Sequence, residues 1–148
     1  MTTQQKIDPK EVQRLRAETS AGVMDCKRAL EDASGDYEKA QALLKERGLA
    51  SVAKKAGREA KEGTVASYIH SGGRIGALVE IASETDFVAR GEDFQKLAQE
   101  VAMQVAAMAP ADLDDLYAQA YIRDASKTIK DLVTAVAVKT GENVSVRR

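Results

Sequence analysis

The chain has 148 residues, of which 44% are hydrophobic and 30% are charged. These fractions are typical of a folded globular protein and exclude an intrinsically disordered one. The formal net charge is −1, so no overall positive field would attract nucleic acid or an anionic membrane surface.

The single cysteine and the N-terminal residues indicate the compartment. Cys26 has no second cysteine to pair with, so no intramolecular disulfide can form, which fits a reducing environment. The first six residues lack the apolar core of a signal peptide, and no apolar run approaches the roughly 18 residues of a membrane span. The sequence therefore predicts a cytoplasmic protein that does not bind membranes.

The first third of the chain predicts three short helices. Asp8 and Pro9 begin the first helix, because aspartate is a good N-cap and proline fits the first helical position. Turn and capping residues delimit the helices: residues 19–22, Ser34, Gly35, Asp36 and Gly48, a plausible C′ residue of the third helix. Together the helices predict a compact three-helix domain over residues 1–50.

A basic stretch follows this domain. Residues 45–61 hold six basic and two acidic residues, a local charge of +4. RNA binding is one interpretation, but the stretch has no aromatic residue on which a base could stack. A solvated linker over residues 51–62 explains the charges better, and we expect no direct nucleic-acid binding.

The second part of the chain combines a hairpin with helices. Residues 65–69 alternate between apolar and polar, Ser71-Gly72-Gly73 is a good turn, and a return strand runs from Arg74 to about Ala82. A long amphipathic helix over residues 92–109, a looser segment over 112–124, a helix capped by Ser126 and ending at Gly141, and a short strand over 143–147 follow. The fold class is α+β, with a small antiparallel-sheet-and-helix core domain over residues 63–148.

The residues offer little to a catalytic interpretation. A nucleophile pair of Cys26 and His70 is conceivable, but the two lie in different predicted modules, and a buried structural thiol explains Cys26 better. The sequence has no Cys/His cluster with metal-ligand spacing, and Gly72, Gly73 and Gly76 do not precede a helix as phosphate-binding loops require. We therefore expect no enzyme, no cofactor and no metal site.

One short polar segment carries a large aromatic residue. Phe87 lies within residues 84–90, between a predicted strand and a predicted helix. Either Phe87 folds back into the core while Thr85 or Asp86 caps the coming helix, or it projects as an anchor for a partner's pocket. The physics of the sequence leaves both alternatives open.

Three stretches of the chain resemble signatures of the elongation factor Ts family, in the family's order. They are residues 74–80 (RIGALVE) followed by 84–89 (ETDFVA), residues 15–16 and 19–30 (TSAGVMDCKRAL), and residues 139–148 (KTGENVSVRR). The resemblance implies a factor that promotes GDP release from elongation factor Tu and binds it in both its GDP-bound and nucleotide-free forms. The runner-up is a binding module that has lost this activity, against which the retention of Asp86 and Phe87 argues.

The resemblance also implies the contact residues. The N-terminal domain would be similar to a ubiquitin-associated (UBA) fold and would dock through Val23, Met24 and Lys27, with Lys55 as a further candidate. The segment Thr85, Asp86, Phe87 and Val88 would enter elongation factor Tu near its Mg²⁺ site and loosen the nucleotide phosphates. We also hypothesise that Asp86 caps the helix over residues 92–109.

The chain departs from the family pattern in length. Many members have a doubled core, whereas this chain has one hairpin and one Thr-Asp-Phe-Val segment, and its region 110–125 is shorter than even short members usually have. Ser20 and Ser83 replace a frequent glycine and a frequent cysteine. Short members act as symmetric homodimers, so the resemblance implies a two-fold dimer here.

Overall fold

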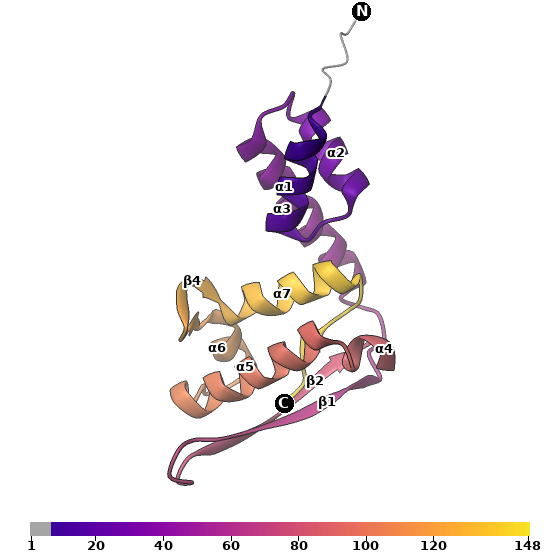
Figure 1. Cartoon of the computed structure of the whole chain (residues 1–148). Coiled ribbons are helices and arrows are strands. Elements are labelled where there is room, and N and C mark those ends of the chain that lie inside the picture. The colour runs from indigo at the N-terminus through magenta and orange to yellow at the C-terminus, as the bar shows by residue number, and fades with distance from the viewer. Residues whose placement is uncertain (1–6) are drawn as a thin grey trace, which may run out of the picture. The chain divides into compact units, whose positions relative to one another are not determined.

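The computed structural model describes residues 7–148 and shows an α+β protein, as predicted, in which helices accompany small antiparallel sheets (Figure 1). The chain divides into two compact units between Lys54 and Lys55. Across residues 7–148, no helix has both the length and the apolar character needed to cross a membrane.

The first unit contains the three predicted helices. They are α1 (Pro9–Thr19), α2 (Val23–Asp32) and α3 (Tyr37–Lys55). Asp8 caps α1, since its Oδ1 accepts a hydrogen bond from the Lys10 amide at 2.9 Å. Leu15, Cys26 and Leu30 are fully buried in a core that all three helices share.

The end of α3 differs from the prediction. Gly48 was expected just past the helix, but α3 continues through Gly48 to Lys55, so part of the predicted linker is helical. A glycine inside a helix costs only about 1 kcal/mol relative to alanine, and the alanines and lysines of residues 50–55 are good helix formers. Only residues 56–61 separate α3 from the first strand.

A three-stranded antiparallel sheet anchors the second unit. Its strands are β1 (Glu62–Ile69), β2 (Gly76–Ser83) and β5 (Ser145–Val146), in the order β1-β2-β5. The predicted hairpin and closing strand are confirmed. Gly63 has φ +154°, and a Cβ there would lie 2.1 Å from the carbonyl oxygen of Ile81, so only glycine allows this close pairing.

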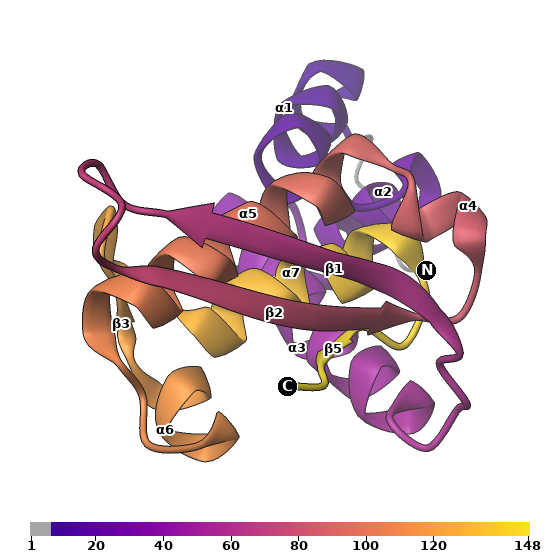
Figure 2. The ribbon, with the colours of Figure 1, turned by 90° about the horizontal axis from the view of Figure 1, so that it is seen from below.

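Helices cover one side of this sheet. Helix α5 (Glu92–Met108) packs on β1 and β2, and α7 (Ile129–Thr140) packs on α5 (Figure 2). Phe94, Leu97 and Val101 of α5 are buried by this packing. The predicted helix over residues 92–109 is therefore confirmed, with its apolar stripe turned inward.

The start of α7 corrects a second prediction. Thr128, not Ser126, is the N-cap: Thr128 Oγ1 accepts from the Asp131 amide at 3.1 Å, and Asp131 Oδ2 accepts from the Thr128 amide at 2.9 Å. Ser126 lies in a strand and binds Asp124 instead. The reciprocal capping box uses two backbone donors at once and so defines the helix start better than a lone serine. The predicted end at Gly141 is confirmed, with φ +73°.

The segment between α5 and α7 is more ordered than predicted. It holds α6 (Leu113–Ala118) and the two-stranded pair β3 (Ala120–Tyr121) and β4 (Asp124–Thr128). Gln104 of α5 is fully buried and holds this segment through both ends of its amide. Its Nε2 donates to the Ala120 carbonyl at 3.1 Å, and its Oε1 accepts from the Ile122 amide at 3.0 Å.

Candidate functional site

The segment after β2 forms a corner whose outer tip is Phe87. Thr85 is the N-cap of helix α4 (Asp86–Ala89), and its Oγ1 accepts a hydrogen bond from the Val88 amide at 3.3 Å. Val88 and Ala89 are buried, whereas Phe87 is 83% exposed. Phe87 therefore projects, and the alternative in which it plugs the core is wrong.

The exposed phenyl ring stands where a partner could bury it. Covering a phenylalanine side chain stabilises a complex by roughly 1.5–3 kcal/mol. The other side of α4 is anchored by Val88 and Ala89, so the ring is carried by a supported corner instead of a loose loop. Aromatic anchors of this kind dominate protein–protein interfaces.

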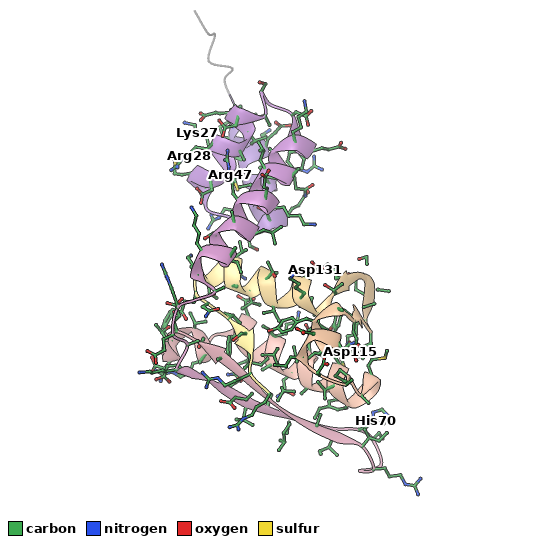
Figure 3. The ribbon with its side chains drawn as sticks, turned by 180° about the vertical axis from the view of Figure 1, so that it is seen from behind. Lys27, Arg28, Arg47, His70, Asp115 and Asp131 are labelled. Carbon is green, nitrogen blue, oxygen red and sulfur yellow. The ribbon has the colours of Figure 1, made fainter. Side chains whose placement is uncertain are left out.

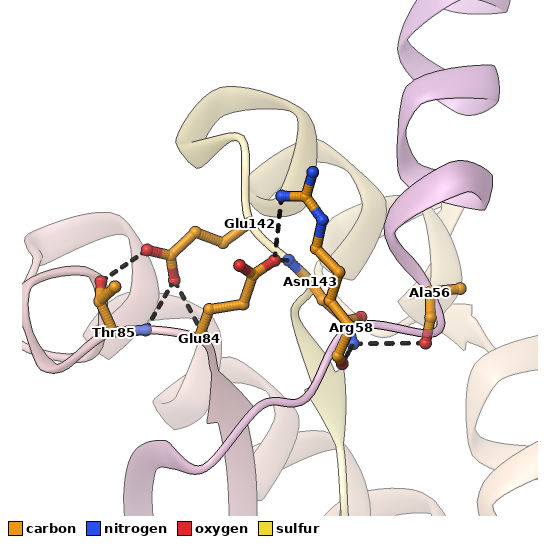
Figure 4. Close-up of polar contacts among 6 residues, drawn as sticks. All are labelled: Ala56, Arg58, Glu84, Thr85, Glu142 and Asn143. Atoms are coloured by element: carbon orange, nitrogen blue, oxygen red, sulfur yellow. Dashed lines mark hydrogen bonds and ion pairs between the residues drawn. The ribbon is translucent and has the colours of Figure 1, made fainter.

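A carboxylate from the C-terminal segment holds the start of α4. Glu142 Oε2 accepts from the amides of Glu84 and Thr85, both at 3.0 Å, and its Oε1 accepts from Thr85 Oγ1 at 2.5 Å (Figure 4). In return, Glu84 Oε1 accepts from the Asn143 amide at 2.7 Å. Residues 84–85 and 142–143 therefore hold each other, although they are distant in the sequence.

A third segment joins this network. Asn143 Nδ2 donates to the carbonyl oxygens of Arg58 at 2.7 Å and Ala56 at 3.4 Å, and the Arg58 guanidinium lies 3.8 Å from Glu84 Oε1 (Figure 4). Arg58, a residue of the basic stretch, therefore contacts other residues of the second unit.

Asp86 does not have the capping role that we hypothesised. Its carboxylate pairs with Arg90, four residues on, and the N-cap of α5 is Gly91, which provides no side-chain acceptor. Asp86 is the first residue of α4, so the rest of this helix lies between it and the first turn of α5. The nearest basic partner for its side chain is therefore Arg90, one turn along the chain. Asp86 is exposed beside Phe87.

An open depression of about 600 Å³ lies next to Phe87. The buried ring of Phe94 contributes to its lining, and the ion pair between Lys139 Nζ and Asp93 Oδ2, at 2.7 Å, borders it. A projecting ring beside a hollow is a surface shape that suits a protein partner better than a small substrate.

The predicted contacts of the first unit lie on one exposed side of α2. Val23 is 49% exposed and Met24 is 56% exposed, both in the first turn of the helix. Lys27 is exposed one turn later, where its Nζ lies 3.7 Å from Glu31 Oε1 (Figure 3). These three residues form a small apolar patch with a basic neighbour.

Lys55 lies elsewhere. It is the last residue of α3 and is half-buried, and its Nζ lies 3.7 Å from the position that a Cβ on Gly141 would take. Lys55 therefore lies close to the segment that contains Glu142.

The two residues considered for catalysis, Cys26 and His70, belong to different units of the chain. Cys26 is fully buried, with its Sγ 3.8 Å from the Ala21 carbonyl oxygen, and so lacks the exposure of a reactive thiol. His70 lies near the tip of the hairpin, where its Nδ1 is 3.0 Å from the Tyr68 hydroxyl (Figure 3). Among residues 7–148, no group of three or more His, Cys, Asp or Glu side chains could hold a metal ion.

Glu142, Asn143 and Arg58 were missed as site residues. Each is polar and adjoins a helix end or a loop, where polar residues are common and carry no specific signal. The partners of Glu142 and Asn143 are 57 to 87 residues away along the chain, and Arg58 pairs with Glu84, which is also distant in the sequence. Only their meeting in space distinguishes them.

The chain matches known proteins over nearly all of its length. A family model described as "Elongation factor TS" matches residues 84–148. Proteins named "Elongation factor Ts" are 42% identical in Anaeromyxobacter dehalogenans and in Caldanaerobacter subterraneus, covering 97% and 96% of this chain and 86% and 94% of the relative. A protein of Guillardia theta named "Elongation factor Ts, chloroplastic" is 41% identical over 97% of this chain and 86% of its own.

These alignments also show a difference in length. The match to the Anaeromyxobacter protein extends over 188 positions, although this chain has 148 residues. The relative therefore carries a substantial set of residues that have no counterpart here. This agrees with the shortening that we noted from the sequence.

Proposed function

The chain belongs to the elongation factor Ts family, and on this basis we propose that it promotes the release of GDP from elongation factor Tu. The observation that carries the proposal is the 83% exposure of Phe87 on a corner that the buried residues Val88 and Ala89 anchor. It acts as a nucleotide exchange factor in the translation machinery of the cytoplasm, with no catalytic residues of its own.

Phe87 enters the partner beside its bound magnesium ion, together with Thr85, Asp86 and Val88. Mg²⁺ bridges phosphate oxygens and contributes much of the affinity for the nucleotide. Displacing the groups that hold the ion therefore loosens GDP. The ion belongs to the partner, and this chain supplies an apolar wedge instead of metal ligands.

Thermodynamic linkage between the two ligands of elongation factor Tu limits what an exchange factor can change. If binding of this chain weakens GDP binding by some ratio, GDP weakens the binding of this chain by the same ratio. The chain therefore accelerates exchange, while the relative amounts of GTP and GDP set its direction. It must bind the nucleotide-free form of the partner more tightly than the GDP-bound form.

The first unit docks on the partner's GTP-binding domain. We assign residues 1–50 to a UBA-like domain, 51–62 to a linker and 63–148 to the core and dimerisation domain. The separate core of α1, α2 and α3 supports the first of these. The exposed pair Val23 and Met24 supplies apolar contact, Lys27 a charge, and Lys55 a further contact from the linker.

Two copies of the chain associate through the open side of the sheet. Val65, Ile69 and Leu78 are 67%, 67% and 72% exposed, on the side of β1 and β2 turned away from α5 (Figure 2). A large apolar side chain on an uncovered sheet face is a typical interaction surface. A two-fold axis would place the same residues on both sides of the contact, which gives a homodimer with one partner molecule for each copy.

The release of a fluorescent GDP analogue from purified elongation factor Tu tests the proposal. We expect the wild-type chain to accelerate release and Phe87→Ala to lose most of the acceleration. Met108→Ala is a matched control, because Met108 is also apolar and 50% exposed but lies at the far end of α5. If the wild-type chain binds the partner without accelerating release, it is a binding module and the proposal fails.

A further inference from the structure

One side chain collects three hydrogen bonds at the base of the corner that carries Phe87. The donors are the amides of Glu84 and Thr85 and the Thr85 hydroxyl, and all three are accepted by the carboxylate of Glu142 at 3.0, 3.0 and 2.5 Å. Hydrogen bonds to a carboxylate are stronger than those between neutral groups. This contact is therefore the main polar attachment at the start of α4.

The attachment reaches the helix through Thr85. The Thr85 hydroxyl donates to Glu142 and at the same time accepts from the Val88 amide at 3.3 Å. Helix α4 has only four residues, and so short a helix has no stability of its own in water. Its direction therefore depends on the groups that hold its two ends.

Glu142 itself occupies a defined position. It follows Gly141, whose left-handed conformation ends α7, and it precedes Asn143, whose amide is held by Glu84 at 2.7 Å. The side chain of Asn143 is held in turn by the carbonyl oxygens of Ala56 and Arg58. Both neighbours of Glu142 are thus restrained, so its carboxylate is a fixed support and not a mobile surface charge.

We propose that Glu142 is a positioning residue that holds α4 in the direction that presents Phe87. That this direction serves nucleotide exchange rests on the proposed function, whereas the restraint of Phe87 does not. Without Glu142, α4 samples several directions and must be ordered when the partner binds. If the presenting direction falls to about a tenth of the population, the apparent affinity for the partner falls about tenfold.

The first measurement follows the mobility of residue 87 in the free protein. The chain has no tryptophan, so Phe87→Trp introduces a single tryptophan, whose emission can be excited apart from the tyrosines and whose time-resolved anisotropy reports local motion. We expect Glu142→Ala to increase the amplitude of fast motion. Glu142→Gln keeps one carbonyl oxygen for the two amides and should restore much of the restraint.

The second measurement uses the native Phe87 and follows GDP release from elongation factor Tu against the concentration of this chain. We expect Glu142→Ala to shift the half-maximal concentration about tenfold upward, with the release rate at saturation retained and Glu142→Gln in between. Asp114→Ala is the matched control, because Asp114 is also acidic but lies exposed on α6, outside the depression beside Phe87. Denaturant unfolding of each variant confirms that it is folded.

The outcomes separate the two proposals. Positioning by Glu142 is overturned if Glu142→Ala and Asp114→Ala give the same mobility and the same concentration dependence. If mobility rises in Glu142→Ala but the wild-type chain does not accelerate release, positioning is supported and the proposed function fails. A variant with raised mobility and an unshifted concentration dependence shows that the restraint does not serve exchange, which overturns the inference.

Discussion

Phe87 and Phe94 are the two phenylalanines of the chain, and they line the same depression from opposite environments. Phe87 is 83% exposed on α4, whereas Phe94 is 1% exposed and belongs to the core between α5 and the sheet. Although only seven positions separate them in the sequence, one phenylalanine is exposed at the surface and the other is a core residue.

This contrast predicts a large loss of stability when Phe94 is truncated and almost none when Phe87 is truncated. Phe94→Ala should lower the free energy of unfolding by about 3–5 kcal/mol, because it leaves a cavity in a packed core. Phe87→Ala should change it by less than about 0.5 kcal/mol, because little of its ring is buried. Urea unfolding followed by circular dichroism measures both, and a loss of several kcal/mol in Phe87→Ala would mean that the ring packs against the protein.

If the first unit docks through α2, a substitution there should lower the affinity for elongation factor Tu and leave the action of Phe87 intact. Met24→Glu places a charge on a side chain that is 56% exposed, and we expect binding to elongation factor Tu to weaken about tenfold. The rate of GDP release at saturation should stay the same, because Phe87 is untouched. Titration calorimetry measures the affinity, and Gln13→Glu on the exposed side of α1 is the control. Equal affinities for the two variants would remove α2 from the interface.

The open side of the sheet predicts the effect of a charge on self-association. Leu78→Lys puts an ammonium group on the apolar face, and a two-fold contact contains it twice. We expect the dimer dissociation constant to rise at least about 100-fold, which corresponds to about 2.7 kcal/mol. Sedimentation velocity measures the change, with Gln99→Lys on the exposed side of α5 as the control. A wild-type chain that stays monomeric at high concentration, or a Leu78→Lys chain that still dimerises, argues against this interface.

The buried amide of Gln104 predicts a localised loss of stability. Gln104→Leu leaves the Ala120 carbonyl and the Ile122 amide without their partner, at a cost of about 1–3 kcal/mol. Hydrogen exchange at the Ile122 amide should accelerate in the variant, and denaturant unfolding measures the total loss. Gln99→Leu, on the exposed side of the same helix, should be nearly neutral. Equal stability of the two variants would show that this network does not hold the segment between α5 and α7.

The carboxylate of Glu80 predicts how stability depends on pH. Its hydrogen bonds with Arg148, at 2.6 Å, and with Arg147, at 3.2 Å, lower the pKa of Glu80. Because the folded pKa lies below the unfolded value of about 4.3, the stabilisation is present in full above that pH and is lost as the pH falls through the folded pKa. Glu80→Gln should therefore be less stable than wild type at pH 7, and the difference should shrink in acid.

Unfolding at several pH values measures this difference, and another ion pair provides the control. Glu59→Gln breaks a pair with Lys61 in which both side chains are 73% exposed, so it should have little effect at any pH. If the difference between wild type and Glu80→Gln is the same at pH 7 and in acid, the arginines do not stabilise the folded protein through this charge.

The sequence by itself determined the features that depend on neighbouring residues. Asp8 and Pro9 start α1, Gly141 ends α7, and the change of period after residue 63 marks the hairpin, because capping and turn formation act within a few positions. The errors at Gly48 and Ser126 have the same local origin. In each case one residue with a suitable side chain was outweighed by its surroundings: good helix formers after Gly48, and a full capping box at Thr128.

Only the tertiary structure decided the features that depend on distant residues. Composition could not show whether Phe87 is buried or exposed, because that depends on which side of α4 meets the rest of the second unit. It also could not show that Glu142 supports Thr85, since 57 residues separate the two. Contacts of this range are set by the packing of β2, α5 and α7 as a whole, and no pattern of nearby residues encodes them.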